Sequence, residues 1–203
     1  MTQGGAHAVP PCIALTGGLG AGKSTALAAL ERLGAATLST DAVVHELYAT
    51  AAVRDAVVAR FGPEVAPAGV VDRGRLAERV FADPADRGWL EQLLWPLVRE
   101  RVSAWRAATA ARVPAPRALV VEVPLLFEAG QEQSYDATLA IVADERLRRE
   151  RAAARGHRAV DERAARQLSQ EEKAARATYV VRNDGDLAQL EHRLSAVLGM
   201  LSR

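Results

Sequence analysis

Residues 17–25 read Gly-Gly-Leu-Gly-Ala-Gly-Lys-Ser-Thr, which has the residue types and the spacing of a phosphate-binding loop. Gly17, Gly22, Lys23 and Ser24 match the pattern G-x-x-x-x-G-K-[ST] at every fixed position. A glycine-rich turn of this kind points successive backbone N–H groups inward, so that they form a nest for an anion. Lys23 can then reach the β- and γ-phosphates of a nucleotide, while the Ser24 hydroxyl can ligate Mg²⁺.

The residues on either side of this loop favour a strand before it and a helix after it. The apolar run 13–15 favours a buried strand. Within residues 24–33, Leu27, Leu30 and Leu33 recur every three residues, which favours a helix that ends at Gly34. Such a helix adds the positive end of its dipole to the anion site. The alternative is a tight strand-to-helix turn with an incidental lysine, which would require neither Lys23 nor so many glycines.

Composition limits the kinds of protein that this chain can be. Its 203 residues, 49% of them hydrophobic, suit one compact unit with small inserted subdomains. A formal net charge of +1 produces no overall electrostatic field that would attract a polyanion, so no nucleic-acid partner is expected. No stretch of about 18 apolar residues is present, so no membrane contact is expected. The lone Cys12 excludes an internal disulfide, and residues 1–11 resemble a flexible leader, so we expect a cytoplasmic protein. Separately, we expect it to be a monomer.

Short apolar runs alternate with helical patterns along the chain. This alternation is typical of an α/β fold, in which a parallel sheet carries helices on both faces. The expected strands are Ile13–Thr16, Ala36–Ser39, Ala118–Val123, Thr138–Val142 and Tyr179–Val181.

Residues 42–112 have a mostly helical pattern without a convincing strand. A stretch this long between two strands of one sheet indicates an inserted helical subdomain over the edge where open α/β folds bind ligands. Trp89, Trp95 and Trp105 lie here, and we expect them to pack the core of this subdomain. The alternative is that one of them lines an acceptor pocket.

Residues 145–166 are rich in arginine, and Gly156 is expected to form a turn between two helices. One interpretation is a solvated helical face. The other is a mobile lid whose arginines close on a triphosphate, because the guanidinium fork holds phosphate oxygens bidentately and stays charged.

Phosphoryl transfer also needs a carboxylate near the acceptor hydroxyl or the metal. Asp41 is the candidate, because it follows the second expected strand and should lie at the carboxyl edge of the sheet. The alternative is that Asp41 caps the helix that begins near Ala42, although Thr40 could cap it instead. Glu122, inside an apolar run, is costly to bury unless it is paired or near a metal, and Glu128 is expected to form a salt bridge.

These residues resemble those of the dephospho-coenzyme A kinases, from Ile13 to about Leu198. Two motifs are narrow: Pro-Leu-Leu-Phe-Glu at 124–128 and Gln-x-x-x-Glu-Glu-Lys at 167–173. The resemblance implies a P-loop NTPase three-layer sandwich with a central parallel sheet, an inserted helical substrate subdomain and a helical lid. It divides the chain into a nucleotide-binding core (12–46, 113–144 and 174–203), a helical acceptor-binding subdomain (47–112) and a lid (145–173).

The reaction that the resemblance implies transfers the γ-phosphate of ATP to the ribose 3′-hydroxyl of dephospho-coenzyme A, with Mg²⁺ as the cofactor. It yields coenzyme A and ADP and is the last step of coenzyme A biosynthesis. Asp41 would be the base or the metal-side carboxylate, Arg151 and Arg155 would act from the lid together with the catalytic Lys23, and Ser24 would ligate the metal. The residues that would bind ATP are Gly18, Gly20, Ala21, Gly22, Lys23, Ser24, Thr25 and, near the adenine, Asn183.

The chain departs from the family pattern at Ser39, His45, Trp95 and Glu122, where the family usually has Asp, Arg, His and Asp. None of these positions lies in the phosphate loop. Ser39 and Glu122 keep the polarity of the family residue in part, whereas His45 and Trp95 bear on the acceptor contacts. Three rival interpretations are another nucleoside or nucleotide kinase of the same fold, a non-catalytic ATP-binding module, and a nucleic-acid-binding protein that uses the arginines.

The first prediction concerns Asp41. The Asp41→Asn variant should lose phosphoryl transfer while it still binds ATP, because the amide cannot accept the proton of the acceptor hydroxyl. Turnover and ATP affinity are measured on the same preparation. An equal loss of both would make Asp41 a binding or folding residue instead.

Overall fold

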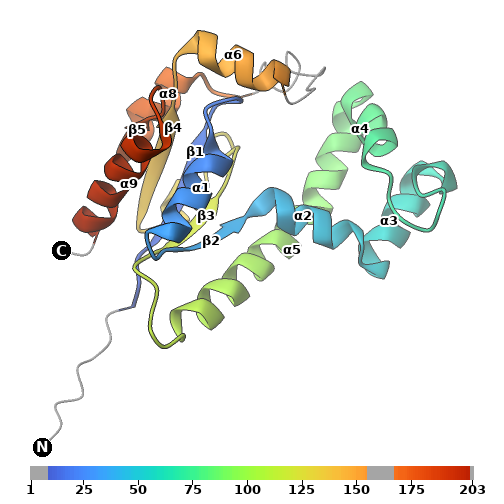
Figure 1. Cartoon of the computed structure of the whole chain (residues 1–203). Helices are drawn as coiled ribbons and strands as arrows, with labels where there is room; N and C mark the ends of the chain where they lie inside the picture. Colours follow the sequence, from blue (N-terminus) through green and yellow to red (C-terminus); the bar gives the residue numbers. More distant parts are fainter. Residues whose placement is uncertain (1–8, 155–166, 202–203) are drawn as a thin grey trace, which may run out of the picture. The chain divides into compact units, whose positions relative to one another are not determined.

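The described part of the chain, residues 9–154 and 167–201 of a computed structural model, is an α/β fold around one five-stranded sheet (Figure 1). The strand order is β2-β3-β1-β4-β5, and β1 pairs in parallel with both β3 and β4, as β4 does with β5. Each expected strand is confirmed to within one residue at either end. The strands are β1 (Cys12–Gly17), β2 (Ala36–Ser39), β3 (Leu119–Glu122), β4 (Ala137–Val142) and β5 (Tyr179–Arg182).

α-Helices lie in three of the four intervals between the strands, while the interval between β3 and β4 contains the short 3-10 turn η2 (Glu132–Ser134). A second 3-10 turn, η1 (Pro63–Val65), follows α3. Within the described residues, no helix combines the length and the apolar composition that crossing a membrane requires. The helices are α1 (Lys23–Arg32), α2 (Thr40–Tyr48), α3 (Ala51–Phe61), α4 (Arg73–Ala82), α5 (Pro84–Ala110), α6 (Glu145–Ala154), α8 (Gln170–Arg176) and α9 (Leu187–Leu201).

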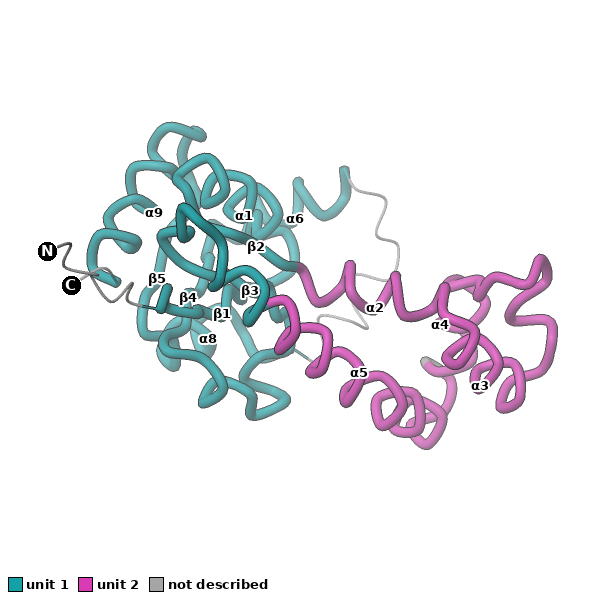
Figure 2. The backbone as a smooth tube through the Cα atoms, turned by 90° about the horizontal axis from the view of Figure 1, so that it is seen from below, with its two compact units in different colours: residues 1–38, 106–203 teal, residues 39–105 magenta. Residues whose placement is uncertain are grey.

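The chain divides into two compact units (Figure 2). Unit 1 consists of Met1–Leu38 and Arg106–Arg203 and contains most of the sheet, while unit 2 is Ser39–Trp105. The helices α2, α3 and α4 belong to unit 2, so the interval that the sequence predicted to be helical is helical. The assignment of residues 47–112 to acceptor binding and of 145–173 to a lid remains a prediction.

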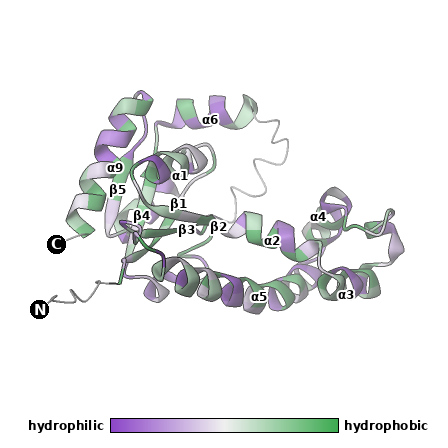
Figure 3. Cartoon of the chain, turned by 60° about the horizontal axis from the view of Figure 1, so that its bottom comes forward, coloured by the Kyte–Doolittle hydropathy of each residue, from purple (hydrophilic) through white to green (hydrophobic). Residues whose placement is uncertain are grey.

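The core of unit 1 lies between one face of the sheet and the helices α1 and α9 (Figure 1). Ile13 and Leu15 of β1 join Leu139 and Ile141 of β4 in this core, because alternate side chains of a strand point to the same face. α9 carries both hydrophobic and hydrophilic residues (Figure 3), and those that are buried recur at helical spacing. They are Leu190, Leu194, Val197 and Leu198.

The opposite face of the sheet is covered in part by α8, which packs against β4 and β1 (Figure 1). A capping box begins this helix: the Ser169 hydroxyl accepts from Glu172 N at 3.1 Å, and Ser169 N donates to Glu172 Oε2 at 2.7 Å. At the edge strand β5, Arg193 Nη1 of α9 donates to the Arg182 carbonyl at 2.5 Å.

Unit 2 has its own small apolar interior. Phe61 meets the Trp89 ring edge-on with 5.5 Å between the ring centroids, and the Arg60 guanidinium lies over the same indole. Trp89 therefore packs as expected. Trp95 is 41% exposed, so the expectation that it packs the core is wrong.

Leu194 offers a test of the core of unit 1. Its side chain is fully buried between α9 and the rest of the core, so Leu194→Ala should lower the free energy of unfolding by about 3 kcal/mol. Leu187→Ala is the matched control on the same helix, because Leu187 is 48% exposed and should cost about 0.5 kcal/mol or less. Urea unfolding measures both, and equal losses would contradict this packing.

Candidate active site

The phosphate-binding loop connects the end of β1 to the start of α1. Gly20 and Gly22 have φ angles of 75° and 91°, in the left-handed region that glycine adopts without strain. Gly22 is the N-cap of α1, so the loop delivers the chain directly into the helix. The expected sequence of strand, glycine-rich loop and helix is confirmed.

Lys23 folds back over this loop. Its Nζ donates to the Gly17 carbonyl at 3.0 Å and to the Gly18 carbonyl at 3.3 Å. Ser24 and Thr25 lie on the first turn of α1 and are exposed. The charge of Lys23 and the amino end of α1 therefore face the same loop, an arrangement that suits a bound anion.

Asn183, just after β5, fixes the loop from the side. It is buried, and its Nδ2 donates to the Ala21 carbonyl at 2.9 Å. A Cβ added to Gly22 would collide with this amide. Residue 22 therefore has two reasons to be glycine: its left-handed φ angle, and the lack of room for a Cβ beside Asn183.

Two arginines of α6 contact the same region. Arg148 Nε donates to the Leu19 carbonyl at 3.1 Å, and the backbone of Arg148 lies where a Cβ on Gly20 would be. Arg151 Nη1 donates to the Asn183 carbonyl at 3.1 Å. Spaced three residues apart, these two side chains share one face of the helix.

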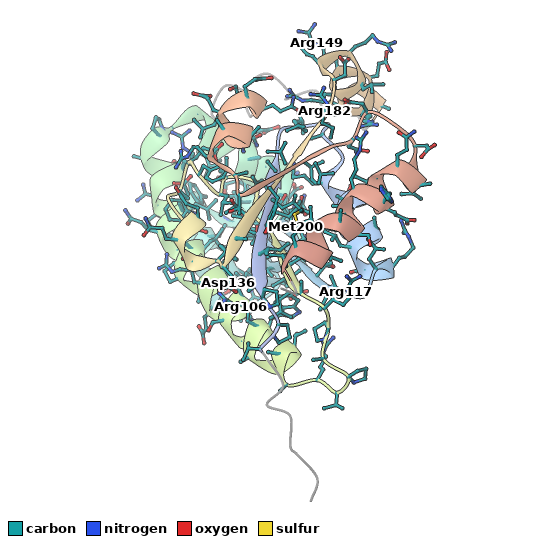
Figure 4. The ribbon with its side chains drawn as sticks, turned by 90° about the vertical axis from the view of Figure 1, so that its left-hand side faces the viewer. Arg106, Arg117, Asp136, Arg149, Arg182 and Met200 are labelled. Carbon is teal, nitrogen blue, oxygen red and sulfur yellow. The ribbon has the colours of Figure 1, made fainter. Side chains whose placement is uncertain are left out.

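The other described arginines of α6 support the solvated interpretation. Arg146 pairs with Glu150, and Arg149 pairs with Glu145, each at i,i+4 spacing and largely exposed. Arg149 and Arg182 lie at one end of the sheet, with Arg106 and Asp136 at the other (Figure 4). α6 therefore has both a solvated face and a loop-facing one. Arg155, the second lid arginine that the sequence singled out, lies outside the described residues.

Acidic side chains near the carboxyl end of β3 are paired or buried. Glu122 is the last residue of β3 and only 9% exposed. Glu128 forms the expected salt bridge, because Lys173 Nζ lies 2.9 Å from Glu128 Oε1. Burial lowers the pKa of Lys173, and the hydrogen bond and charge of Glu128 oppose that shift.

Asp41 lies in unit 2, on the exposed first turn of α2. The N-cap of this helix is Ser39, so neither Asp41 nor Thr40 caps it. Further along α2, His45 Nδ1 lies 3.0 Å from Arg73 Nη1. Because a guanidinium only donates, this contact requires Nδ1 to accept, which an arginine at position 45 could not do.

The residues present fit Mg²⁺ bound together with a nucleotide. No group of three or more histidine, cysteine or acidic side chains that could hold a metal occurs in the described ranges. Mg²⁺ does not need one, because it usually takes one or two protein oxygens and completes its shell with phosphates and water. The exposed Ser24 hydroxyl is such an oxygen beside the loop. Burial raises the pKa of the Cys12 thiol to about 11, which disfavours the thiolate that would bind a metal.

Arg148 is the loop contact that the sequence did not single out as a site residue. Its spacing of three residues from Arg151 is a signal for a shared helix face, yet the same spacing also joins Arg146 and Arg149. Only the packing of α6 against the loop separates the two faces.

Gly22 offers a direct test of the loop. Gly22→Ala should raise the dissociation constant for ATP by about tenfold or more, because alanine disfavours a φ of 91° and its Cβ meets Asn183. Gly199→Ala in α9 is the control, since its Cβ would meet nothing within 4 Å and should leave binding unchanged. Titration calorimetry measures both, and tight binding by Gly22→Ala would contradict the arrangement.

The family model and the similar curated sequences agree on one family. A family model described as dephospho-CoA kinase matches residues 11–189. A dephospho-CoA kinase of Deinococcus radiodurans is 42% identical over 195 residues, covering 95% of this chain and 93% of that protein.

Solved structures give the same fold. A crystal structure from Thermus thermophilus has a TM-score of 0.79 at 35% identity and covers 97% of this chain and 100% of its own. A dephospho-CoA kinase from Campylobacter jejuni has a TM-score of 0.68 at 23% identity, with 94% and 96% covered. The sheet, the loop and these likenesses together define a P-loop NTPase fold, and the chain belongs to the dephospho-CoA kinase family.

Proposed function

We propose that this enzyme transfers the γ-phosphate of ATP to the ribose 3′-hydroxyl of dephospho-coenzyme A, giving coenzyme A and ADP. The observation that carries the proposal is the glycine-built loop of residues 17–25, against which Lys23 lies. The acceptor is taken from the named relatives, with which the chain aligns over nearly its whole length.

The loop and α1 hold the triphosphate in this proposal. Backbone N–H groups of Gly18 and of residues 20–25 bind phosphate oxygens, and Lys23 exchanges its contacts with loop carbonyls for the β- and γ-phosphates. Ser24 supplies an oxygen to Mg²⁺, which when bound neutralises charge on the phosphates. Asn183 donates to the Ala21 carbonyl of the loop, and in this proposal it also contributes to the adenine side of the nucleotide site.

Three side chains act on the reacting groups in this proposal. Asp41 accepts the proton of the 3′-hydroxyl as that oxygen attacks phosphorus. Arg151, with Lys23, stabilises the charge on the phosphoryl oxygens, as a guanidinium does without losing its proton. Arg148 holds the loop through the Leu19 carbonyl and so keeps its amides aligned. Acceptor binding is assigned to the helical residues 47–112.

An assay of ADP release with a panel of acceptors tests the proposed reaction. Dephospho-coenzyme A should support turnover, whereas adenosine, nucleoside monophosphates and water alone should support little. Removal of Mg²⁺ with EDTA should abolish turnover and restoration of Mg²⁺ should recover it. Lys23→Ala is the inactive control, because it removes a charge that stabilises the transferring phosphoryl group.

The outcomes separate the rival interpretations. Preference for a nucleoside monophosphate would make the chain a different kinase, and ATP binding with no acceptor-dependent ADP release would make it a non-catalytic module. Its single described cysteine is free and buried, which suits the reducing cytoplasm in which we expect the enzyme to act as a monomer.

A further inference from the structure

The buried ammonium of Lys173 is a feature that the proposed chemistry does not use. Its side chain has no exposed surface, although lysine is among the residues that proteins almost never bury completely. From α8, Lys173 Nζ donates to the Pro124 carbonyl at 2.6 Å and to Glu128 Oε1 at 2.9 Å. A buried charge is tolerated only where it is paired and hydrogen-bonded, and both conditions are met here.

The Pro124 carbonyl connects this lysine to the phosphate-binding loop. It also accepts a hydrogen bond from Thr16 Oγ1 at 3.3 Å, and Thr16 is fully buried. Thr16 immediately precedes Gly17, the first residue of the loop, and Pro124 follows shortly after Glu122, which ends β3. One carbonyl thus joins the carboxyl ends of β1 and β3 to the ammonium on α8.

The Glu128 carboxylate depends on the same ammonium. Its Oε1 also accepts from Leu168 N at 2.8 Å, while its Oε2 is buried without a hydrogen-bond partner among the described residues. Replacement of a buried ion pair by an apolar pair of similar volume is often neutral or stabilising, so such a pair is weak evidence for stability, whereas its hydrogen bonds also fix directions. The geometry of this cluster is therefore better explained by positioning than by stability.

We propose that Lys173 is a positioning residue for phosphoryl transfer, which holds the Pro124 carbonyl and, through Thr16, the point at which the phosphate-binding loop leaves β1. The inference rests on the proposed kinase function. Small errors in the position of the triphosphate reduce the rate far more than they reduce binding, since reacting atoms must be aligned closely.

The test removes the charged pair without leaving one member alone. In the double variant Lys173→Met/Glu128→Gln, kcat should fall by about tenfold or more while both KM values change by less than about threefold. The matched control is Arg176→Met/Glu132→Gln, which removes an ion pair of 2.6 Å between the same helix and the same connection. Its kcat should stay within about twofold of the parent. Thermal unfolding is recorded for both.

A second pair of variants tests the route through Thr16. Thr16→Val removes the hydroxyl and should lower kcat, whereas Thr16→Ser keeps it and should restore most of the rate. When Thr16→Val is combined with Lys173→Met/Glu128→Gln, it should lower kcat by a smaller factor than it does in the parent enzyme, because both changes act on the same carbonyl. If Lys173→Met/Glu128→Gln does not fold, the kcat values of Thr16→Val and Thr16→Ser alone decide whether the inference holds.

Two results would overturn the inference. One is a double variant with a lower melting temperature but the kcat of its control, which would leave Lys173 a structural role only. The other is equal kcat for Thr16→Val and Thr16→Ser. Failure of the parent enzyme to phosphorylate dephospho-coenzyme A would instead reject the proposed function, so the two failures are distinguishable.

Discussion

The close packing around two glycines of the phosphate-binding loop is the constraint on which the rest of the site depends. Gly20 lies against the backbone of Arg148, and Gly22 lies against the side chain of Asn183. No Cβ fits at either position, so only glycine lets α6 and the end of β5 come this close and hydrogen-bond to the loop. A nest of amides that is already formed before the anion arrives costs no reorganisation during the reaction.

The middle position of β1 makes this possible. β1 is hydrogen-bonded on both sides, and all its residues are buried, so its carboxyl end is a fixed point. Gly17 leaves the sheet from there, between β3 and β4. The side chains that surround the loop come from elements far apart in sequence, yet they all lie next to this one strand end or next to its neighbours.

The loop, the strands and the helical interval could be predicted because their signals are local. Four fixed positions specify the loop around Lys23, and short apolar runs specify the strands. The loop-facing role of Arg148 and the complete burial of Lys173 could not be predicted. Both depend on which face of a helix packs inward, and that is decided by tertiary contacts which no short stretch of sequence contains. Trp95 was misjudged for the same reason, since a tryptophan in a helical segment can lie on either side.

The hydrogen bond from Arg193 to the Arg182 carbonyl has a consequence for how copies of this protein meet. An outermost strand offers its outward carbonyls and amides to any other extended segment, which is a common start of aggregation. Here the Arg193 guanidinium of α9 already donates a hydrogen bond to one of those carbonyls, and β5 is only four residues long. Strand addition by a second molecule would have to displace that charge first, so this border of the sheet is protected against self-association.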